Sequence, residues 1–296
     1  MRCRICDNAE INQVFQIREM MFGYRDLFTY FRCANCNCLQ ISEIPSDISK
    51  YYPSNYYSLS ETKFDMTGDF IKLMVEEEVR YYFSGFGVTR ETRVLDVGCG
   101  SGFSVYALKE IGFSKALGVD FYIDGDIEHQ NGAKIIKGTI QDINQEFDVI
   151  TFNHSFEHLA EPVQALQKAA QLLPKNGLCL VRMPVFPSYA WEHYGPHWAQ
   201  LDAPRHFVIY SIETVKRVAR KAGLQLKRVL YDSSDFQFWA SEQYRQDIPL
   251  FSEKSYSVNP SNSIFSQEQI EAFGRMAKQL NNEKRGDQAA FYLVKK

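Results

Sequence analysis

A glycine-rich turn after a short apolar run is the part of this sequence best suited to chemistry. The run Val94–Val97 leads into the turn Gly98–Gly102, written G-C-G-S-G, and a helical pattern follows over residues 103–110. Glycine lacks a side chain, so its backbone can approach a ligand closely and can adopt positive φ. One acid, Asp96, precedes the first glycine, and a second predicted strand ends in Asp120.

The acid before the first glycine and the spacing of the glycines distinguish this turn from a pyrophosphate-binding turn. Dinucleotide-binding units also end their second strand with an acid, which holds a ribose, but their fingerprint is G-x-G-x-x-G and it places a pyrophosphate on the helix N-terminus. Here the third glycine comes one residue earlier. Asp96 would repel a pyrophosphate but suits an ammonium group. The alternative is a tight strand-to-helix connection that binds no ligand.

Four of the seven cysteines form two C-x2-C pairs near the N-terminus, Cys3 with Cys6 and Cys33 with Cys36. Such a pair puts two thiolates on one tight turn, and two pairs complete a tetrahedral Zn²⁺ site. The alternatives are disulfides or free thiols, and Cys38 is expected to be a packed thiol. Alternating residues between the pairs predict two strands of a small ribbon over residues 1–42, which metal would hold together because its core is small.

A zinc ribbon can bind nucleic acid, but the charge balance here argues against it. Arginines and acids nearly cancel within the ribbon, and the whole chain of 296 residues has a formal net charge of −3. A phosphate-tracking surface would be basic. The ribbon aromatics could stack bases, but we expect them to fill the ribbon and face the substrate or the main domain.

The overall composition is that of a globular enzyme, with 45% hydrophobic and 23% charged residues. The sequence contains no apolar run near the ~18 residues that span a bilayer. It begins with a cysteine pair rather than a signal peptide, which predicts a cytoplasmic location. The oligomeric state is left open.

Strand and helix patterns alternate after Asp120. Short apolar strands are predicted at residues 133–137, 146–153, 178–183, 224–231 and 289–294, with helices at 162–173 and 211–222 between them. This alternation predicts an α/β fold whose parallel sheet is covered by helices on both faces. Asp96, Asp120 and Asn153 end three strands, and the carboxyl ends of such strands form the ligand site. Only a short helix is expected between Asp120 and Ile135.

Residues 43–90 form a predicted connector or lid that includes a helix within 64–83. Tyr56 and Tyr57 could line the site or simply pack. Residues 233–287 form an insertion before the last strand, with a helix at 266–281. Insertions of this length are usually lids, binding walls or oligomer contacts, and its aromatics Phe236, Phe238, Trp239 and Tyr244 favour an acceptor wall.

The glycine turn, D-V-G-C-G-S-G, resembles motif I of the class I S-adenosylmethionine (SAM) methyltransferases. The segments F-D-V-I-T-F-N-H-S-F-E-H-L at 147–159 and L-L-P-K-N-G at 172–177 are similar to the later strands of that family. W-A-Q-L-D-A-P-R-H-F-V-I-Y-S at 198–211 and the C-terminal 280–295 resemble the members that carry an N-terminal zinc ribbon. Many of those members modify sugars or surface polysaccharides.

The resemblance implies a seven-stranded Rossmann-like domain over residues 91–296 that binds SAM and releases S-adenosylhomocysteine. It implies that the glycine backbone lines the methionine part and that Asp120 binds both ribose hydroxyls. Thr139, Ile140 and Gln141 are the nearest candidates for adenine, with Asp142 as a further candidate or a helix cap. The implied cofactor residues are Asp96, Gly98, Cys99, Gly100, Gly102, Asp120, Thr139, Ile140, Gln141 and Asn153.

Methyl transfer to a sugar hydroxyl requires a general base, for which histidine is the expected residue. The candidates are His154 and His158 after the fourth main strand, and His206 beside Asp202 in the following long loop. Each could instead have a structural role. A second metal at His193, His197 and Asp202 is disfavoured because hard cations prefer oxygen ligands.

Three functions from different classes therefore remain. The favoured one is a SAM-dependent methyltransferase acting on a hydroxyl or carbon of a sugar or glycan intermediate. The second is a zinc-ribbon methyltransferase acting on RNA, protein or another small metabolite. The third is a SAM- and zinc-binding scaffold without catalysis. Trp191, Tyr194 and Trp198 could stack on a sugar ring or pack on the sheet.

Overall fold

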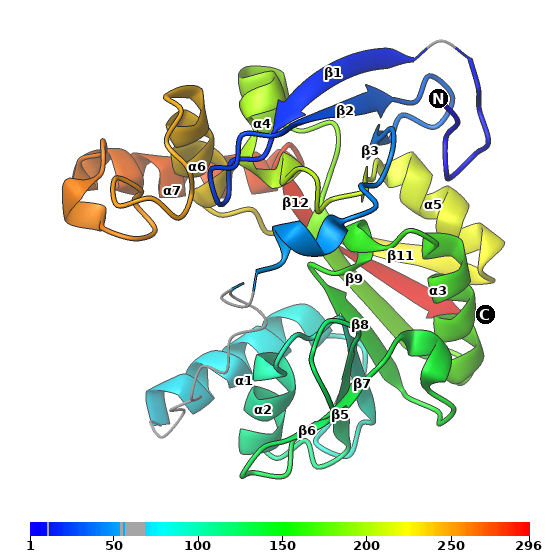
Figure 1. Ribbon diagram of the computed structural model, residues 1–296. Helices are drawn as coiled ribbons and strands as arrows, with labels where there is room; N and C mark the ends of the chain where they lie inside the picture. Colours follow the sequence, from blue (N-terminus) through cyan, green and yellow to red (C-terminus); the bar gives the residue numbers. More distant parts are fainter. Residues whose placement is uncertain (11, 54–55, 57–68) are drawn as a thin grey trace.

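An eight-stranded sheet forms the centre of the computed structural model, which describes residues 1–10, 12–53, 56 and 69–296 (Figure 1). The strand order across it is β11-β12-β9-β8-β4-β5-β7-β6. The strands are β4 (Val94–Val97), β5 (Ala116–Asp120), β6 (Ile127–Glu128), β7 (Lys134–Lys137), β8 (Val149–Asn153), β9 (Leu178–Pro184), β11 (Leu224–Tyr231) and β12 (Gln288–Lys295).

The central strands β7, β5, β4, β8 and β9 run parallel, and β12 is inserted antiparallel between β9 and β11. The chain moves from β4 to β5 on one side and returns to β8 on the other. The strand order therefore switches between β4 and β8, and the carboxyl ends at such a switch leave a crevice for a ligand.

Helices cover both faces of this sheet because its strands are apolar on both sides. Helices α3 (Pro162–Leu172) and α5 (Ile212–Lys221) pack on the face that includes Leu95 and Phe291. Helices α1 (Asp69–Phe83) and α2 (Phe103–Glu110) pack on the opposite face, with Val94 and Tyr292. Ser211 caps α5 by accepting the backbone N–H of Thr214, as its sequence position predicts.

A second sheet combines the N-terminal ribbon with a distant part of the chain. Its order is β1 (Gln13–Arg18), β2 (Leu27–Arg32), β3 (Leu39–Ile41) and β10 (Val208–Ile209). β10 pairs antiparallel with β3, so the loop after β9 completes the ribbon sheet. Figure 1 shows this sheet above the carboxyl ends of the main strands, beside α4 (Tyr189–Tyr194), α6 (Phe236–Arg245) and α7 (Gln267–Asn282).

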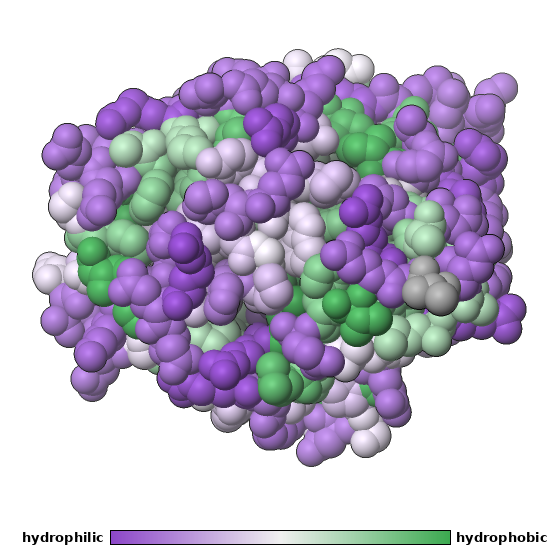
Figure 2. Space-filling view, turned by 90° about the horizontal axis from the view of Figure 1, so that it is seen from above, coloured by the Kyte–Doolittle hydropathy of each residue, from purple (hydrophilic) through white to green (hydrophobic). Residues whose placement is uncertain are grey.

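The face seen from above carries apolar side chains only in separate patches among polar ones, for the described residues drawn there (Figure 2). It therefore presents no single broad apolar surface. No helix in the described part of the chain has the length and apolar character required to cross a membrane.

The expected short helix between Asp120 and Ile135 is wrong. Residues 121–133, all of which the structure describes, contain no helix and instead form β6, which pairs antiparallel with β7. The physical reason is the Asn131-Gly132 pair, a hairpin signal, with Gly132 at φ +78°. The main sheet thus gains an eighth strand.

The expected acceptor wall of the insertion is also wrong, because none of its four aromatics, Phe236, Phe238, Trp239 and Tyr244, lines the cavity. Phe238, Trp239 and Tyr244 of α6 are buried, and Trp239 and Tyr244 pack in one cluster with Met20 and Met21 of the ribbon. The aromatics of the 184–210 loop pack as well. Trp198 is 1% exposed and donates its indole N–H to Asp287 over 2.9 Å. Trp191 meets Phe15 edge to face.

Candidate active site

The glycine turn joins β4 to α2, and two of its backbone N–H groups hold it against β5. Gly98 donates its N–H to the carbonyl of Val119 over 2.8 Å, and Gly100 donates to Asp120 Oδ2 over 2.7 Å. Gly98 has φ +72°, and a Cβ at this position would lie 2.4 Å from the Cβ of Ser155. Glycine is required here because both the backbone angle and the space exclude a side chain.

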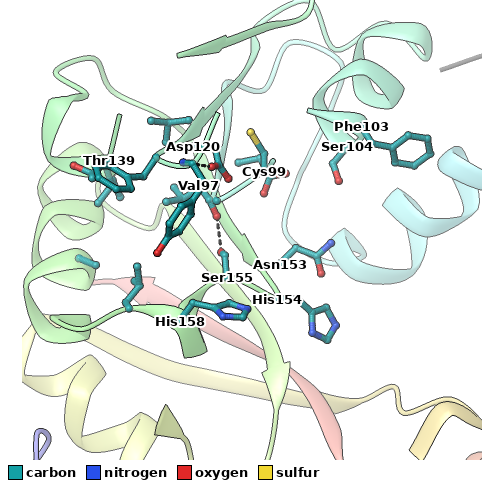
Figure 3. Close-up of a pocket in the computed structure, with 18 of the residues that line it drawn as sticks. Val97, Cys99, Phe103, Ser104, Asp120, Thr139, Asn153, His154, Ser155 and His158 are labelled. Carbon is teal, nitrogen blue, oxygen red and sulfur yellow. Dashed lines mark hydrogen bonds between the residues drawn. The ribbon is translucent and has the colours of Figure 1, made fainter. Parts of the chain in front are cut away.

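A cavity of about 1630 Å³ opens at the carboxyl ends of β4, β5 and β8 (Figure 3). It brings together most of the cofactor and base residues expected from the sequence. These are Asp96, Gly98, Cys99, Asp120, Thr139, Ile140, Gln141, Asn153, His154 and His158. Gly100 and Gly102 shape the turn instead, with Gly102 at φ +91° directly before α2.

The two acids lie side by side at the strand ends. Asp120 accepts the backbone N–H groups of Gly100 and Tyr122, each over 2.7 Å, and burial raises the pKa of its carboxyl. Asp96 accepts the Thr151 hydroxyl over 2.7 Å. Burial, with smaller contributions from Asp120 and Glu78, raises the pKa of the Asp96 carboxyl to about 7. A cationic ligand group would therefore restore its charge.

The far end of the cavity is a short helical turn that follows β7. Asp142 accepts the backbone N–H of Thr139 over 2.8 Å and its hydroxyl over 2.9 Å. The helix-cap interpretation of Asp142 is thus confirmed. This cap holds Ile140 and Gln141 at the cavity wall.

Helix α1 forms one wall of the cavity, whereas the sequence predicted only a helix within residues 64–83. Its residues Glu77, Glu78, Tyr81 and Tyr82 line the cavity. Tyr52, which also lines the cavity, stacks on Tyr122 with ring centroids 4.6 Å apart. Tyr56 is buried and lines the cavity too, whereas Tyr57 lies outside the described residues.

Three histidines surround the buried carboxylate of Glu157 just after β8. His154 Nδ1 is 3.5 Å from Glu157 Oε1, and His206 Nε2 is 3.8 Å from the same oxygen. The rings of His158 and His206 have centroids 4.7 Å apart. Burial would raise the pKa of Glu157, but the histidines outweigh it and lower that pKa to about 2. Burial also lowers the pKa of His158, to about 4.

His154 and His158 are both partly exposed, whereas His206 is buried. The side chain of His154 is 26% exposed and its backbone has φ +50° at the end of β8. A positive φ is uncommon outside glycine and is often found at functional sites. Figure 3 shows His154 and His158 along the same edge of the cavity, below Asn153 and Ser155.

Asp202 does not line the cavity and instead belongs to a buried ion-pair network. Arg205 is fully buried and donates to both of its oxygens, over 2.6 Å and 2.9 Å. Arg205 also bonds Glu19 of the ribbon over 3.0 Å. This buried network ties the ribbon to the segment that carries His206, and no local sequence pattern signals it.

Two groups among the described residues have the composition and spacing to hold a metal ion. One is Cys3, Cys6, Cys33 and Cys36, and the other is Glu157, His158 and His206. The set His193, His197 and Asp202 is not brought together among these residues; His193 stacks on Tyr189 instead.

The cysteine group has the dimensions of a tetrathiolate zinc site. Cys3 Sγ and Cys36 Sγ are 3.6 Å apart, as are Cys6 Sγ and Cys33 Sγ. With Zn–S bonds of about 2.3 Å, the sulfurs of a tetrahedral site lie about 3.8 Å apart. Cys38 is buried beside them and receives the side-chain N–H of Gln40 over 2.9 Å. The residues present therefore fit a zinc ion.

Comparison with known proteins adds a family match. The sequence model described as "Methyltransferase domain" matches residues 70–229, which is more than half of the chain. No curated protein matches.

Several solved structures are similar at low identity. A cyclopropane synthase from Mycobacterium tuberculosis is 16% identical, with a TM-score of 0.46, 74% of this chain and 84% of that chain covered. A SAM-dependent methyltransferase from Archaeoglobus fulgidus is 18% identical, with a TM-score of 0.45 and coverages of 76% and 94%. A magnesium protoporphyrin IX methyltransferase from Synechocystis is 10% identical, with a TM-score of 0.47 and coverages of 84% and 95%.

Proposed function

The chain belongs to the methyltransferase-domain family, and from that premise we propose that this SAM-dependent methyltransferase methylates a hydroxyl or carbon of a sugar or glycan intermediate. In the proposal a histidine acts as general base, and the four-cysteine group holds a structural zinc ion. The observation that carries it is one cavity whose wall includes both the acids at the ends of β4 and β5 and two histidines after β8.

The residues of the glycine turn account for cofactor binding in this proposal. When bound, SAM supplies a methyl group activated by a positively charged sulfonium. Asp96 would hold its ammonium group and Asp120 would accept the ribose hydroxyls, while Ile140 and Gln141 would hold adenine. The glycine backbone leaves the space that the methionine part needs.

The size of the cavity and the polar residues that α1 adds to its wall support a hydroxyl-rich acceptor. At about 1630 Å³ it exceeds the ~300–1000 Å³ of ordinary small-molecule sites, so it has room for a cofactor and a second molecule. Glu77 and Glu78 offer oxygens to acceptor hydroxyls, and Tyr81 offers a flat face to a sugar ring.

His154 is the base that we favour among the three histidines. A base with a pKa of about 4, such as His158, drives proton transfer weakly near neutral pH. His154 lines the cavity, and the Glu157 carboxylate 3.5 Å away favours the imidazolium formed when His154 accepts the acceptor proton. Bound SAM would supply the methyl group to the acceptor oxygen that His154 deprotonates and would leave as S-adenosylhomocysteine.

Asp120→Asn should weaken SAM binding by about 10- to 100-fold, because one charge-assisted hydrogen bond contributes ~1.5–3 kcal/mol. Asparagine keeps an acceptor for one of the two backbone N–H groups, so the loop should remain folded. Calorimetric titration with SAM measures the change. Gln141→Ala, at the adenine end, should have a smaller effect. Equal affinity of Asp120→Asn and the parent protein would contradict the ribose role.

SAM affinity should fall as the pH drops below about 7. In the free protein Asp96 has a pKa of about 7, so below that pH its carboxyl is protonated and cannot pair with the SAM ammonium, which stays charged at low pH. We expect a loss of roughly tenfold per pH unit once the pH is well below 7. Calorimetry in buffers of different ionisation enthalpy should also detect proton release on binding at pH 6.5.

The Asp96→Asn variant is the control for this pH dependence. Asp120 and Glu78 also face Asp96, and Asp120 itself has a raised carboxyl pKa. In Asp96→Asn the affinity should be lower at pH 8 and its slope with pH smaller. An unchanged slope would assign the titration to Asp120 instead.

The acceptor class is tested directly by product analysis. The protein is incubated with SAM and a panel of nucleotide sugars, and methylated products and S-adenosylhomocysteine are measured by mass spectrometry. Methylation of at least one sugar is the expected result. Turnover with RNA or protein and with none of the sugars would overturn the sugar proposal while leaving methyl transfer intact.

A further inference from the structure

Glu157 is a buried carboxylate without a close hydrogen-bond donor in the part of the chain that the structure describes. Its side chain is 0% exposed, and neither oxygen has a hydrogen-bond partner among the described residues. The nearest polar atoms are imidazole nitrogens at 3.5 Å and 3.8 Å. Burying an ionised carboxylate without a partner costs free energy of folding. We therefore expect a positively charged group to bind beside Glu157.

Two imidazoles beside Glu157 are held in the orientation typical of metal ligands. His158 Nδ1 is 2.8 Å from the carbonyl oxygen of Arg205, and His206 Nδ1 is 2.8 Å from that of Gln200. A carbonyl oxygen can only accept, so each Nδ1 carries the proton and donates it. Each neutral ring therefore keeps its lone pair on Nε2. Histidines that bind metals are usually fixed by such a bond to a carbonyl or carboxylate.

The three groups are close enough to share one ion. A carboxylate oxygen of Glu157 and one ring nitrogen each of His158 and His206 all lie within 4.8 Å of one another. Ligands at about 2.1 Å from a metal are about 3.0–3.4 Å apart, so small side-chain rotations would complete the contact. His158 lines the large cavity, while Glu157 and His206 are buried beside it.

We propose that Glu157, His158 and His206 bind a divalent transition-metal ion at the wall of the cavity, where it would hold oxygen atoms of the acceptor. The acceptor role rests on the proposed function; the metal site does not. Two imidazoles and one carboxylate favour zinc, iron or manganese over magnesium and calcium, and they leave coordination positions open.

The ion would complement His154 rather than replace it. A metal-bound hydroxyl is more acidic than a free one, so His154 would take its proton without the help of the Glu157 carboxylate, which the ion would occupy. His154 is outside the three-residue group and remains free for that role. A protonated histidine is the other possible partner for Glu157, but a dication compensates the carboxylate without placing imidazolium charges side by side.

Co²⁺ is the probe for this site, because its absorption spectrum reports its ligands. Co²⁺ is added to protein that retains zinc on its cysteines. The expected result is a visible spectrum without thiolate charge-transfer bands that saturates at one equivalent. Glu157→Gln and His206→Asn should each weaken Co²⁺ binding at least about tenfold, while His193→Asn should not.

Zinc content and SAM affinity show whether the variants are folded. The metal site is supported if either Glu157→Gln or His206→Asn keeps its zinc content and SAM affinity but loses Co²⁺ binding. The site is overturned if Co²⁺ leaves the parent spectrum unchanged, or if a folded variant binds it as tightly as the parent. If the parent protein binds SAM but not Co²⁺, the metal site is overturned and the proposed function is not. If it binds Co²⁺ but not SAM, the proposed function is overturned and the metal site is not.

Discussion

His154→Asn should lower kcat by about 10²- to 10⁴-fold, the usual contribution of a general base, and leave SAM affinity within about twofold. Asparagine is the variant of choice because His154 has φ +50°, and asparagine tolerates the left-handed region better than alanine does. Loss of rate would then reflect loss of the imidazole rather than strain in the backbone. S-adenosylhomocysteine formation with the methylated acceptor gives kcat, and calorimetry gives the SAM affinity.

Two further measurements separate a base from a packing residue. His193→Asn removes an imidazole that stacks on Tyr189, away from the cavity residues, and should leave kcat unchanged. In His154→Asn the KM for the acceptor should change much less than kcat, because a base acts on the chemical step. A kcat within about threefold of the parent value would remove His154 from the mechanism.

Cys33→Ser should release zinc and lower the free energy of unfolding by more than about 4 kcal/mol, as loss of a structural metal does. The cause is the position of Cys33, which joins the β2 end of the ribbon to the Cys3–Cys6 turn. Hydrogen exchange should rise first in β1, β2 and β3. Metal analysis and thermal unfolding measure the two main effects.

Cys38→Ser is a closely matched control. Cys38 is as buried as Cys33 and lies 3.4 Å from Cys36 Sγ, but it is outside the four-residue group. A serine hydroxyl can still accept the Gln40 side-chain N–H. This variant should keep one zinc ion per chain. Loss of zinc from Cys38→Ser but not from Cys33→Ser would reassign the ligand set.

Loss of zinc should also weaken the contacts that position His158 and His206 beside the cavity. Tyr30 of β2 donates its hydroxyl to the carbonyl oxygen of His206 over 2.9 Å, and Glu19 bonds Arg205. The backbone carbonyl oxygen of Arg205 in turn accepts the ring N–H of His158. Disordering the ribbon therefore removes supports of His158 and His206, while the glycine turn at Gly98 is held by β5 and should still bind SAM.

Much of the main sheet could be predicted because its signals are local. The run Val94–Val97, the glycines after it and the helical pattern from Phe103 define a strand, a turn and a helix without reference to the rest of the chain. β11 and the cap at Ser211 were predicted correctly for the same reason. Because parallel strands align their carboxyl ends, the strand pattern also indicated that Asp96, Asp120 and Asn153 would share a site.

The buried aromatics show where local patterns mislead. Trp198, Phe238 and Tyr244 have the composition of a sugar-binding surface, yet they pack in the interior. An aromatic side chain suits a binding wall and a core equally well. Only the position of the ribbon, with Met20 and Met21 against α6, distinguishes the two.

The amino-acid sequence by itself determined the glycine turn with its two acids, the alternation of strands and helices, and the paired cysteines, because each depends on residues close together in the chain. Tertiary structure alone decided that β10 completes the ribbon sheet and that Arg205 joins Glu19 to Asp202. It also decided that His206 meets Glu157 and His158 beside the cavity. Apart from the local Asp202–Arg205 pair, these contacts to β3, Glu19, Glu157 and His158 join residues 48 to 186 positions apart, and no spacing rule links such distant residues before the chain folds.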